Sequence, residues 1–208
     1  MSWQEAWAEK RTPWDAGQSP PILEALVAQD VLPHGHALVP GCGSGYDVLT
    51  LASPERTVLG LDLAEGARER FEKLRDSRGI PAEHAAVRTG NFFEYDHDER
   101  FDMVWDYTFL CAIEPEMRDR WVERMHEIIA PSGELVTLIF PVRSIDERPP
   151  EDAEGPPYPM HPELVRELVE PRFECIELRA VTESNEGREG MEWLGRWRPV
   201  HSENSSTS

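Results

Sequence analysis

A glycine-rich turn between two regularly patterned segments constrains the fold of this 208-residue chain more than any other feature. Gly41-Cys-Gly-Ser-Gly45 follows an apolar stretch at 37–40, which predicts a buried strand, and precedes a helical pattern at 46–52. A second predicted strand, 57–62, ends on the carboxylate of Asp62, about 20 residues after the first glycine. Glycines let a backbone approach a ligand closely, and an acid at the end of the next strand accepts hydrogen bonds from ribose hydroxyls. The pattern predicts an α/β fold with a nucleoside cradle at one edge of its sheet.

Strand-like and helix-like patterns continue to alternate along the chain. Predicted helices lie at 22–30, 46–52, 63–77, 115–129 and 162–169, and predicted strands at 37–40, 57–62, 85–93, 101–105, 134–140, 173–182 and 190–199. Such alternation is typical of βαβ units with right-handed crossovers and a parallel sheet. Residues 143–161 are rich in Pro, Glu and Gly and predict a long loop, which in a compact domain is usually functional. We expect one domain over residues 1–200 and a disordered polar tail at 201–208.

The charge of the chain restricts its partners. Asp and Glu number 40 against 21 Lys and Arg, which gives a formal net charge of −19. Nucleic acids and anionic membranes are bound through basic surfaces, so we expect neither as a partner. The longest apolar run, at 135–142, is far shorter than the ~18 residues of a membrane span, and the N-terminus shows no secretory signal. We therefore expect a soluble, cytoplasmic protein.

Cysteine and histidine spacings provide no framework for disulfides or metals. Cys42, Cys111 and Cys175 are odd in number and widely separated. His34 and His36 could share a strand face, but no Cys or carboxylate partner follows nearby, which favours a loop leading into the first strand. We therefore expect no bound metal, and at Cys111 a buried thiol rather than a nucleophile.

Distinctive strings are spread along nearly the whole chain, from Trp3 to Trp197. The strings Trp3-x-x-x-Trp7, Thr12-Pro-Trp-Asp15 and Ala37-Leu-Val-Pro-Gly-Cys-Gly43 resemble the thiopurine methyltransferase superfamily. Others are similar to its halide/thiocyanate methyltransferase branch, namely Ala52-Ser-Pro-Glu-Arg56, Asp106-Tyr107, Phe109-Leu-Cys-Ala-Ile-Glu-Pro-Glu-Met-Arg118, Gly155-Pro-Pro-Tyr158 and Leu194-Gly-Arg-Trp197.

This resemblance implies the class I fold of methyltransferases that use S-adenosylmethionine (SAM). That fold has a mostly parallel sheet of about seven strands flanked by helices, here with an N-terminal helical lid over residues 1–21. The third glycine supports this reading, because it comes one place earlier than in the dinucleotide fingerprint. Carried over position by position, the resemblance implies SAM contacts at Trp3, Trp7, Trp14, Gly41, Asp62, Asn91, Phe92 and Tyr107. The family usually has Asp where this chain has Asn91, whose amide can both accept and donate.

We predict transfer of the SAM methyl group to a small anionic nucleophile, with S-adenosylhomocysteine as the second product. The candidate nucleophiles are iodide, bromide, chloride, bisulfide and thiocyanate. Such ions have no proton to lose, so the reaction needs alignment and exclusion of water rather than a general base. Trp14, Tyr107 and Tyr158 form the predicted dry catalytic pocket, in which the phenol O–H groups can donate to the anion. The aromatic faces of a lid over SAM attract the sulfonium by ~0.5–2 kcal/mol. Glu114 and Glu116 are interpreted as acids that favour a helix N-terminus, and we expect a monomer.

Several alternatives stay open at this stage. The glycine turn could be purely structural, with Asp62 as a helix cap, and Trp3 and Trp7 at helical spacing could be core anchors. A thiol or thiopurine S-methyltransferase of the same superfamily would have a larger pocket. A NAD-dependent dehydrogenase is disfavoured by the early third glycine. A SAM-binding regulator would bind SAM tightly without forming S-adenosylhomocysteine.

Overall fold

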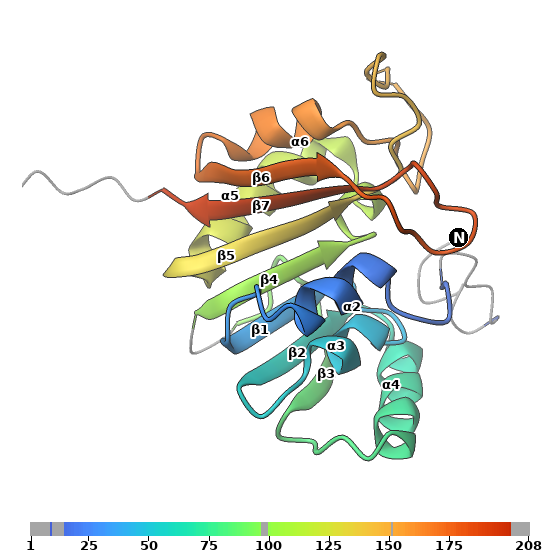
Figure 1. Cartoon of the computed structure of the whole chain (residues 1–208), viewed down its shortest axis with the longest axis vertical. Helices are drawn as coiled ribbons and strands as arrows, with labels where there is room; N and C mark the ends of the chain where they lie inside the picture. The colour runs from blue at the N-terminus through green and yellow to red at the C-terminus, as the bar shows by residue number, and fades with distance from the viewer. Residues whose placement is uncertain (1–8, 10–14, 97–99, 151, 201–208) are drawn as a thin grey trace, which may run out of the picture.

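The computed structural model has a seven-stranded sheet at its centre (Figure 1). It describes residues 9, 15–96, 100–150 and 152–200. The strand order is β3-β2-β1-β4-β5-β7-β6, in which β7 is antiparallel to both of its neighbours and all other pairs are parallel. The expected mostly parallel sheet is confirmed. Its strands are β1 (Gly35–Pro40), β2 (Arg56–Asp62), β3 (Ala85–Thr89), β4 (Phe101–Tyr107), β5 (Ile129–Ile139), β6 (Phe173–Ala180) and β7 (Trp193–Pro199).

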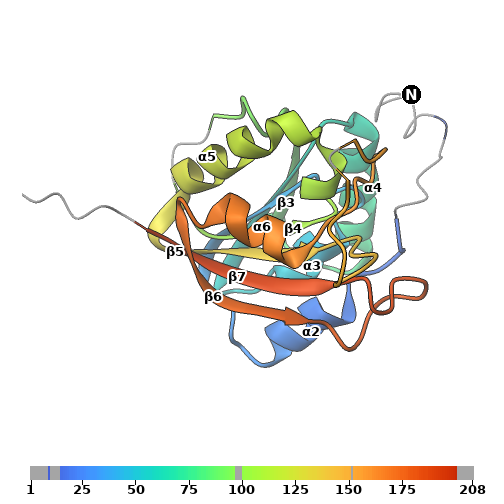
Figure 2. The same ribbon diagram turned by 90° about the horizontal axis from the view of Figure 1, so that it is seen from above.

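Helices cover both faces of the sheet. One buried cluster joins α2, α3 and Phe71 of α4 to one face, and a second joins α5 and α6 to the other. Figure 2 shows α5 and α6 above the sheet and α2 below it. This three-layer arrangement buries the inner strands on both sides, which is why they read as apolar runs in the sequence. The helices are α2 (Pro21–Ala28), α3 (Tyr46–Leu51), α4 (Glu65–Ser77), α5 (Arg118–Ile128) and α6 (Pro162–Val169), with short 3₁₀ helices η1 (Leu110–Ala112) and η2 (Pro115–Met117).

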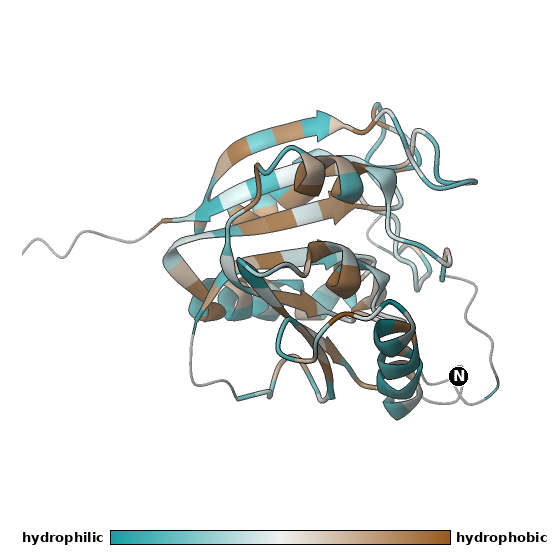
Figure 3. Cartoon of the chain, turned by 60° about the horizontal axis from the view of Figure 1, so that its bottom comes forward, coloured by the Kyte–Doolittle hydropathy of each residue, from teal (hydrophilic) through white to brown (hydrophobic). Residues whose placement is uncertain are grey.

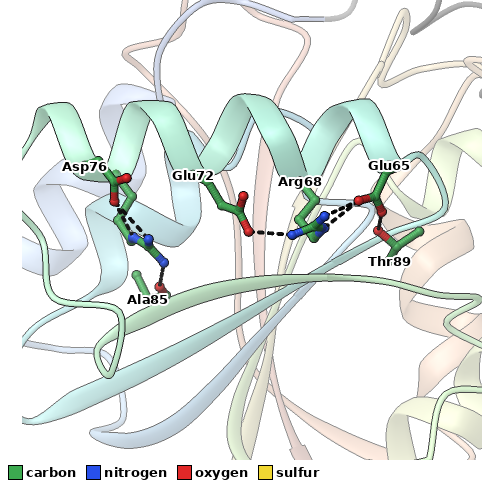
Figure 4. Close-up of polar contacts among 7 residues, drawn as sticks. Glu65, Arg68, Glu72, Asp76, Ala85 and Thr89 are labelled. Carbon is green, nitrogen blue, oxygen red and sulfur yellow. Dashed lines mark hydrogen bonds and ion pairs between the residues drawn. The ribbon is translucent and has the colours of Figure 1, made fainter.

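The most polar of these helices is α4, which lies beside β3 with its outer face towards solvent (Figure 3). Arg68 donates to Glu65 one turn before it and, at 2.6 Å, to Glu72 one turn after it (Figure 4). Glu65 also accepts the hydroxyl of Thr89 at 2.6 Å. That last bond ties the start of α4 to the end of β3, so two elements at the carboxyl edge of the sheet are held together.

Most predicted boundaries lie within about three residues of the observed ones, and three segments differ more from the structure. The strand expected at 85–93 ends at Thr89, because Asn91 forms a turn in which its Oδ1 accepts the N–H of Phe93 at 3.1 Å. The helix expected at 115–129 is divided into η2 and α5. Residues 131–133, expected to precede a strand, lie inside β5, where the pairing with β4 shifts register between Phe101 and Met103.

The N-terminal helix, the lid at 1–21 and the tail at 201–208 fall largely or wholly outside the described residues, so all three stay predictions. The same is true of Trp3, Trp7 and Trp14. Within the described part of the chain, each helix is too short or too polar to cross a membrane.

Candidate active site

A cleft opens at the carboxyl ends of β1 and β4, the two strands between which the order along the sheet changes direction. Ligands of such sheets bind in the crevice at this switch point. The cleft has an empty volume of about 520 Å³, part of it open to solvent. Residues 41–44 of the glycine turn line one part of it, and Asp47, Tyr107, Thr108 and Arg188 line another. Of the predicted contacts, Gly41 and Tyr107 are therefore brought together.

The glycine turn has a left-handed backbone. Gly41, Gly43 and Gly45 have φ angles of 58°, 53° and 75°, which residues with a Cβ rarely adopt. A Cβ on Gly41 would lie 2.5 Å from Cδ2 of Phe109, so a side chain there would force a shift. The turn consequently presents mainly backbone to the cleft, as a close approach to a ligand requires.

Asp62, at the end of β2, bonds the turn directly. Its Oδ2 accepts the N–H of Gly43 at 2.9 Å, and its Oδ1 accepts the N–H of Ala64, just before α4, at 2.9 Å. Burial raises the pKa of this carboxyl, and the backbone donors oppose that rise. Asp62 therefore has two backbone partners within the protein. Each carboxylate oxygen still has a lone pair for a ribose hydroxyl, so the residue fits both the structural and the cofactor role.

Asn91 and Phe92 follow β3 and lie outside the residues that line the cleft. The Asn91 amide oxygen is directed to its own turn, and Phe92 is buried, with its ring edge-to-face with Phe109 at 5.2 Å between centroids. Phe109 is also the ring against which Gly41 packs. Phe92 therefore packs on Phe109, which in turn lies against Gly41 of the glycine turn. A direct SAM contact at Asn91 and Phe92 stays a prediction.

Tyr107, the last residue of β4, joins a polar cluster that sequence reasoning missed. Its hydroxyl donates to Oε1 of Glu192 and accepts a hydrogen bond from Nη1 of Arg188. The Arg188 guanidinium carbon lies 5.1 Å from the centre of the Tyr107 ring and 4.7 Å from that of Phe140, within cation–π range. Burial and the Glu192 charge raise the pKa of Tyr107. The cleft therefore contains a cation held over two aromatic rings.

Asp47, from α3, adds a carboxylate to the same cleft. Its Oδ2 accepts the indole N–H of Trp105 at 2.8 Å. Burial raises its pKa to about 6, while hydrogen bonds from Trp105 and Ser19 and the charge of Arg188 oppose the rise. A carboxyl with this pKa changes its charge close to neutral pH, which is common at functional sites.

Tyr158, predicted to share a pocket with Tyr107, is not among the residues that line the cleft, and its place in the catalytic pocket stays a prediction. Its hydroxyl donates to Glu114, its N–H donates to the carbonyl of Cys111 at 2.7 Å, and its ring packs on Gly155. These contacts attach the long loop to the segment around η1 and η2. Cys111 is buried and its pKa is raised to about 12, mainly by burial, which suits an inert thiol.

The missed residues Arg188 and Glu192 come from the segment that connects β6 to β7. Its sequence Glu-Ser-Asn-Glu-Gly-Arg-Glu-Gly resembles an ordinary polar turn, and no local pattern shows that β7 inserts beside β5. Thr108 was also missed. It is a β-branched residue with φ of 64°, a strained conformation that clusters at functional sites, and its hydroxyl donates to the Tyr107 carbonyl at 2.6 Å.

The histidines near the first strand have ordinary polar partners. His34 pairs with Asp30 at 2.8 Å, and Nδ1 of His36 lies 2.7 Å from the Thr57 hydroxyl. Over the residues that the structure describes, His, Cys, Asp and Glu side chains form no group of three or more that could hold a metal.

Comparison with known proteins gives a consistent family. Residues 1–196 match the thiopurine S-methyltransferase family. The chain is 43% identical over 198 residues to a probable thiol methyltransferase 2 of Arabidopsis thaliana, covering 94% of this chain and 84% of that protein. It is 38% identical over 200 residues to thiocyanate methyltransferase 1 of the same plant, covering 96% and 85%.

Solved structures share the fold at lower identity. A 1,6-didemethyltoxoflavin N1-methyltransferase from Burkholderia thailandensis, with bound S-adenosylhomocysteine, superposes with a TM-score of 0.70 at 19% identity and covers 95% of this chain and 85% of its own. Magnesium protoporphyrin IX methyltransferase from Synechocystis PCC 6803, with bound SAM, gives 0.65 at 15%, covering 86% and 76%. The sheet therefore has the class I SAM methyltransferase fold. The chain belongs to the thiopurine S-methyltransferase family and is a SAM-dependent methyltransferase of the thiol/thiocyanate methyltransferase type.

Proposed function

We propose that the enzyme methylates small anionic nucleophiles, with thiocyanate, halides and bisulfide as its substrates. The observation that carries this proposal is the Arg188 guanidinium, which lines the cleft beside Tyr107 in a protein of net charge −19. A half-buried cation in such a chain offers a local site for an anion that the surface as a whole repels. The 38% identity to a thiocyanate methyltransferase supports the same substrate class.

The residues around the cleft have separable roles in this proposal. SAM supplies a methyl group on a positively charged sulfur. The glycine-rich backbone of residues 41–44 lets a ligand approach closely, and the remaining lone pairs of Asp62 can accept hydrogen bonds from ribose hydroxyls. Both features fit the adenosine part of SAM. Tyr107 and Phe140 hold Arg188 in place by their ring faces. The anion then needs only alignment and loss of water, because it attacks the methyl carbon without first losing a proton.

The test is product formation from SAM and each sodium salt in turn, with methyl halides and methyl thiocyanate measured in the headspace by gas chromatography. We expect iodide to have a higher kcat/KM than bromide, and bromide than chloride. The smaller ion holds its water more strongly, and a few protein donors replace less of that shell. Each ~1.4 kcal/mol of difference in barrier separates two rates tenfold. Absence of product with every anion would contradict the proposal.

A second candidate function is S-methylation of organic thiols. The 43% identity to a probable thiol methyltransferase favours it. Turnover of iodide compared with that of thiophenol, at equal SAM concentration, separates the two candidates. A larger kcat/KM for the aromatic thiol than for any inorganic anion would make organic thiols the primary substrates.

A further inference from the structure

Glu192 is a buried acid that methylation of an anion does not use. Its side chain belongs to a residue that is 1% exposed. Oε1 accepts the Tyr107 hydroxyl, whereas Oε2 is buried and has no hydrogen-bond partner in the described part of the chain. Burial of a carboxylate with an unpaired oxygen costs free energy, so such a group beside a cleft is a candidate for function.

Tyr107 connects this acid to the cleft. Its phenol oxygen has one proton and two lone pairs. The proton is donated to Glu192, and one lone pair accepts from Arg188, so one lone pair is left. Because Tyr107 lines the cleft, a nucleophile bound there can donate a hydrogen bond to that lone pair. A thiol can do this through its S–H group, while thiocyanate and the halides have no hydrogen to donate.

We propose that Tyr107 and Glu192 form a proton relay that lets this cleft methylate neutral thiols as well as preformed anions. The relay rests on the proposed function, because it uses the same cleft and the same methyl donor. The thiol proton moves to the Tyr107 oxygen while the Tyr107 proton moves to Oε1 of Glu192. The electron pair released on the thiol sulfur forms the bond to the methyl carbon, and the bond from that carbon to the sulfonium breaks. The broken bond leaves its pair on the sulfur of S-adenosylhomocysteine, and Glu192 later returns the proton to solvent.

The charges around the relay favour a concerted transfer. Burial and the charge of Glu192 oppose ionisation of Tyr107. The phenol therefore takes up the thiol proton at the same time as it gives its own proton to Glu192. Among the described residues, two charged or titratable side chains face the Tyr107–Glu192 pair: Asp47 from α3 and Arg188 from the β6–β7 connection. The charge of Arg188 favours the ionised state of Asp47, the second carboxyl beside the relay.

Glu192→Gln keeps the shape of the side chain and removes the acceptor. The probes are thiocyanate and 2-mercaptoethanol, an alkyl thiol that, like the Cys side chain with its pKa of ~8.5, is mostly protonated at pH ~7. We expect the ratio of kcat/KM for 2-mercaptoethanol to that for thiocyanate to fall by roughly 100-fold, a usual contribution of positioned proton transfer. Glu186→Gln, an exposed acid on the same connection, is the matched control and should leave the ratio unchanged.

The pH profile separates a relay from a structural effect. In the wild type, kcat/KM for 2-mercaptoethanol should change little with pH around neutrality. In Glu192→Gln it should rise about tenfold per pH unit below the pKa of the thiol, because the variant depends on thiolate formed in solution. High pH should therefore rescue the thiol activity of the variant selectively. An equal loss for both nucleophiles with an unshifted profile would overturn the relay.

Two further measurements keep the test decisive. Calorimetric titration with S-adenosylhomocysteine checks that Glu192→Gln retains its cofactor site. If Glu192→Gln does not fold, Tyr107→Phe takes its place in the same assays.

A selective loss of thiol activity in Asp47→Asn, but not in Glu192→Gln, would assign the proton to Asp47 and overturn the proposal. Wild-type enzyme that methylates no anion at all would instead contradict the proposed function. Wild type that methylates thiocyanate with an unchanged ratio in Glu192→Gln would contradict only the relay.

Discussion

At the scale of single residues, Asp62 holds the glycine turn through one backbone hydrogen bond and the residue before α4 through another. We expect Asp62→Ala to weaken binding of S-adenosylhomocysteine at least about tenfold, because hydrogen bonds to charged groups contribute ~1.5–3 kcal/mol. We also expect its free energy of unfolding to fall by ~1–3 kcal/mol, since two N–H groups lose their acceptor. Calorimetric titration and urea unfolding measure the two effects.

Asp102 provides the matched control for this change. It lies at the opposite edge of the sheet, at the start of β4, and accepts the N–H of His36 at 2.8 Å. Asp102→Ala should lower the free energy of unfolding while the affinity for S-adenosylhomocysteine stays the same. If Asp62→Ala folds and binds with wild-type affinity, the cofactor role of Asp62 is wrong.

Asp106 links the stability of the fold to pH. It is 2% exposed and accepts hydrogen bonds from the Leu110 N–H and the Trp121 indole, yet burial raises its pKa to about 6 from an ordinary value of about 3.9. A raised carboxyl pKa means that the folded state holds the proton more tightly than the unfolded state. The associated stabilisation is present below pH ~4 and is lost as the pH rises through ~6.

Asp106→Asn removes this titration. We therefore expect the free energy of unfolding of the wild type, minus that of Asp106→Asn, to fall by about 3 kcal/mol between pH ~4 and pH ~7. Urea unfolding of both proteins across this range is the measurement. A difference that does not vary with pH would show that Asp106 is unperturbed in the fold.

At the scale of elements, Arg56 holds the end of α3 and the connection from α2 to β1 against the sheet. The residue is 3% exposed, and its guanidinium donates to the carbonyls of Leu32, Pro33 and Leu51 at 3.1, 2.8 and 3.1 Å. Arg56→Met leaves three carbonyls without this donor, and we expect a loss of roughly 3 kcal/mol or more in urea unfolding. Arg68→Met on α4 is the contrast, because exposed ion pairs contribute little. Equal effects of the two substitutions would contradict this account.

The helices and strands also show how much of the fold and of the site the sequence could predict. The positions of β1, β2 and the glycine turn were predictable, because apolar runs, glycines and the acid at a strand end are local signals. The end of β3 was predicted too late, because the Asn91 turn is followed by Phe92 and Phe93, residues that are typical of strands. Arg188 and Glu192 were not predictable, because they reach the cleft only through the pairing of β7 with β5. Long-range strand order leaves no trace in a local pattern.

At the scale of the whole molecule, the net charge of −19 opposes the approach of an anionic substrate. We expect kcat/KM for thiocyanate to rise severalfold between ~10 and ~150 mM ionic strength, over which the screening length falls from about 30 Å to about 8 Å. Sodium sulfate adjusts the ionic strength, since halide salts would compete. The value of kcat at saturating thiocyanate is the internal control, because capture no longer limits it. A falling kcat/KM would show attraction rather than repulsion at long range.

The antiparallel pair β6–β7 has an evolutionary consequence. Residues 41–44, which we propose to bind the methyl donor, belong to the N-terminal half of the chain, whereas Arg188 and Glu192 come from a single connection, residues 181–192, close to the C-terminus. Mutations in that connection can therefore alter the choice of nucleophile without disturbing the machinery for the methyl donor. We therefore expect that grafting the corresponding segment from a relative changes the choice of nucleophile while the affinity for S-adenosylhomocysteine stays the same.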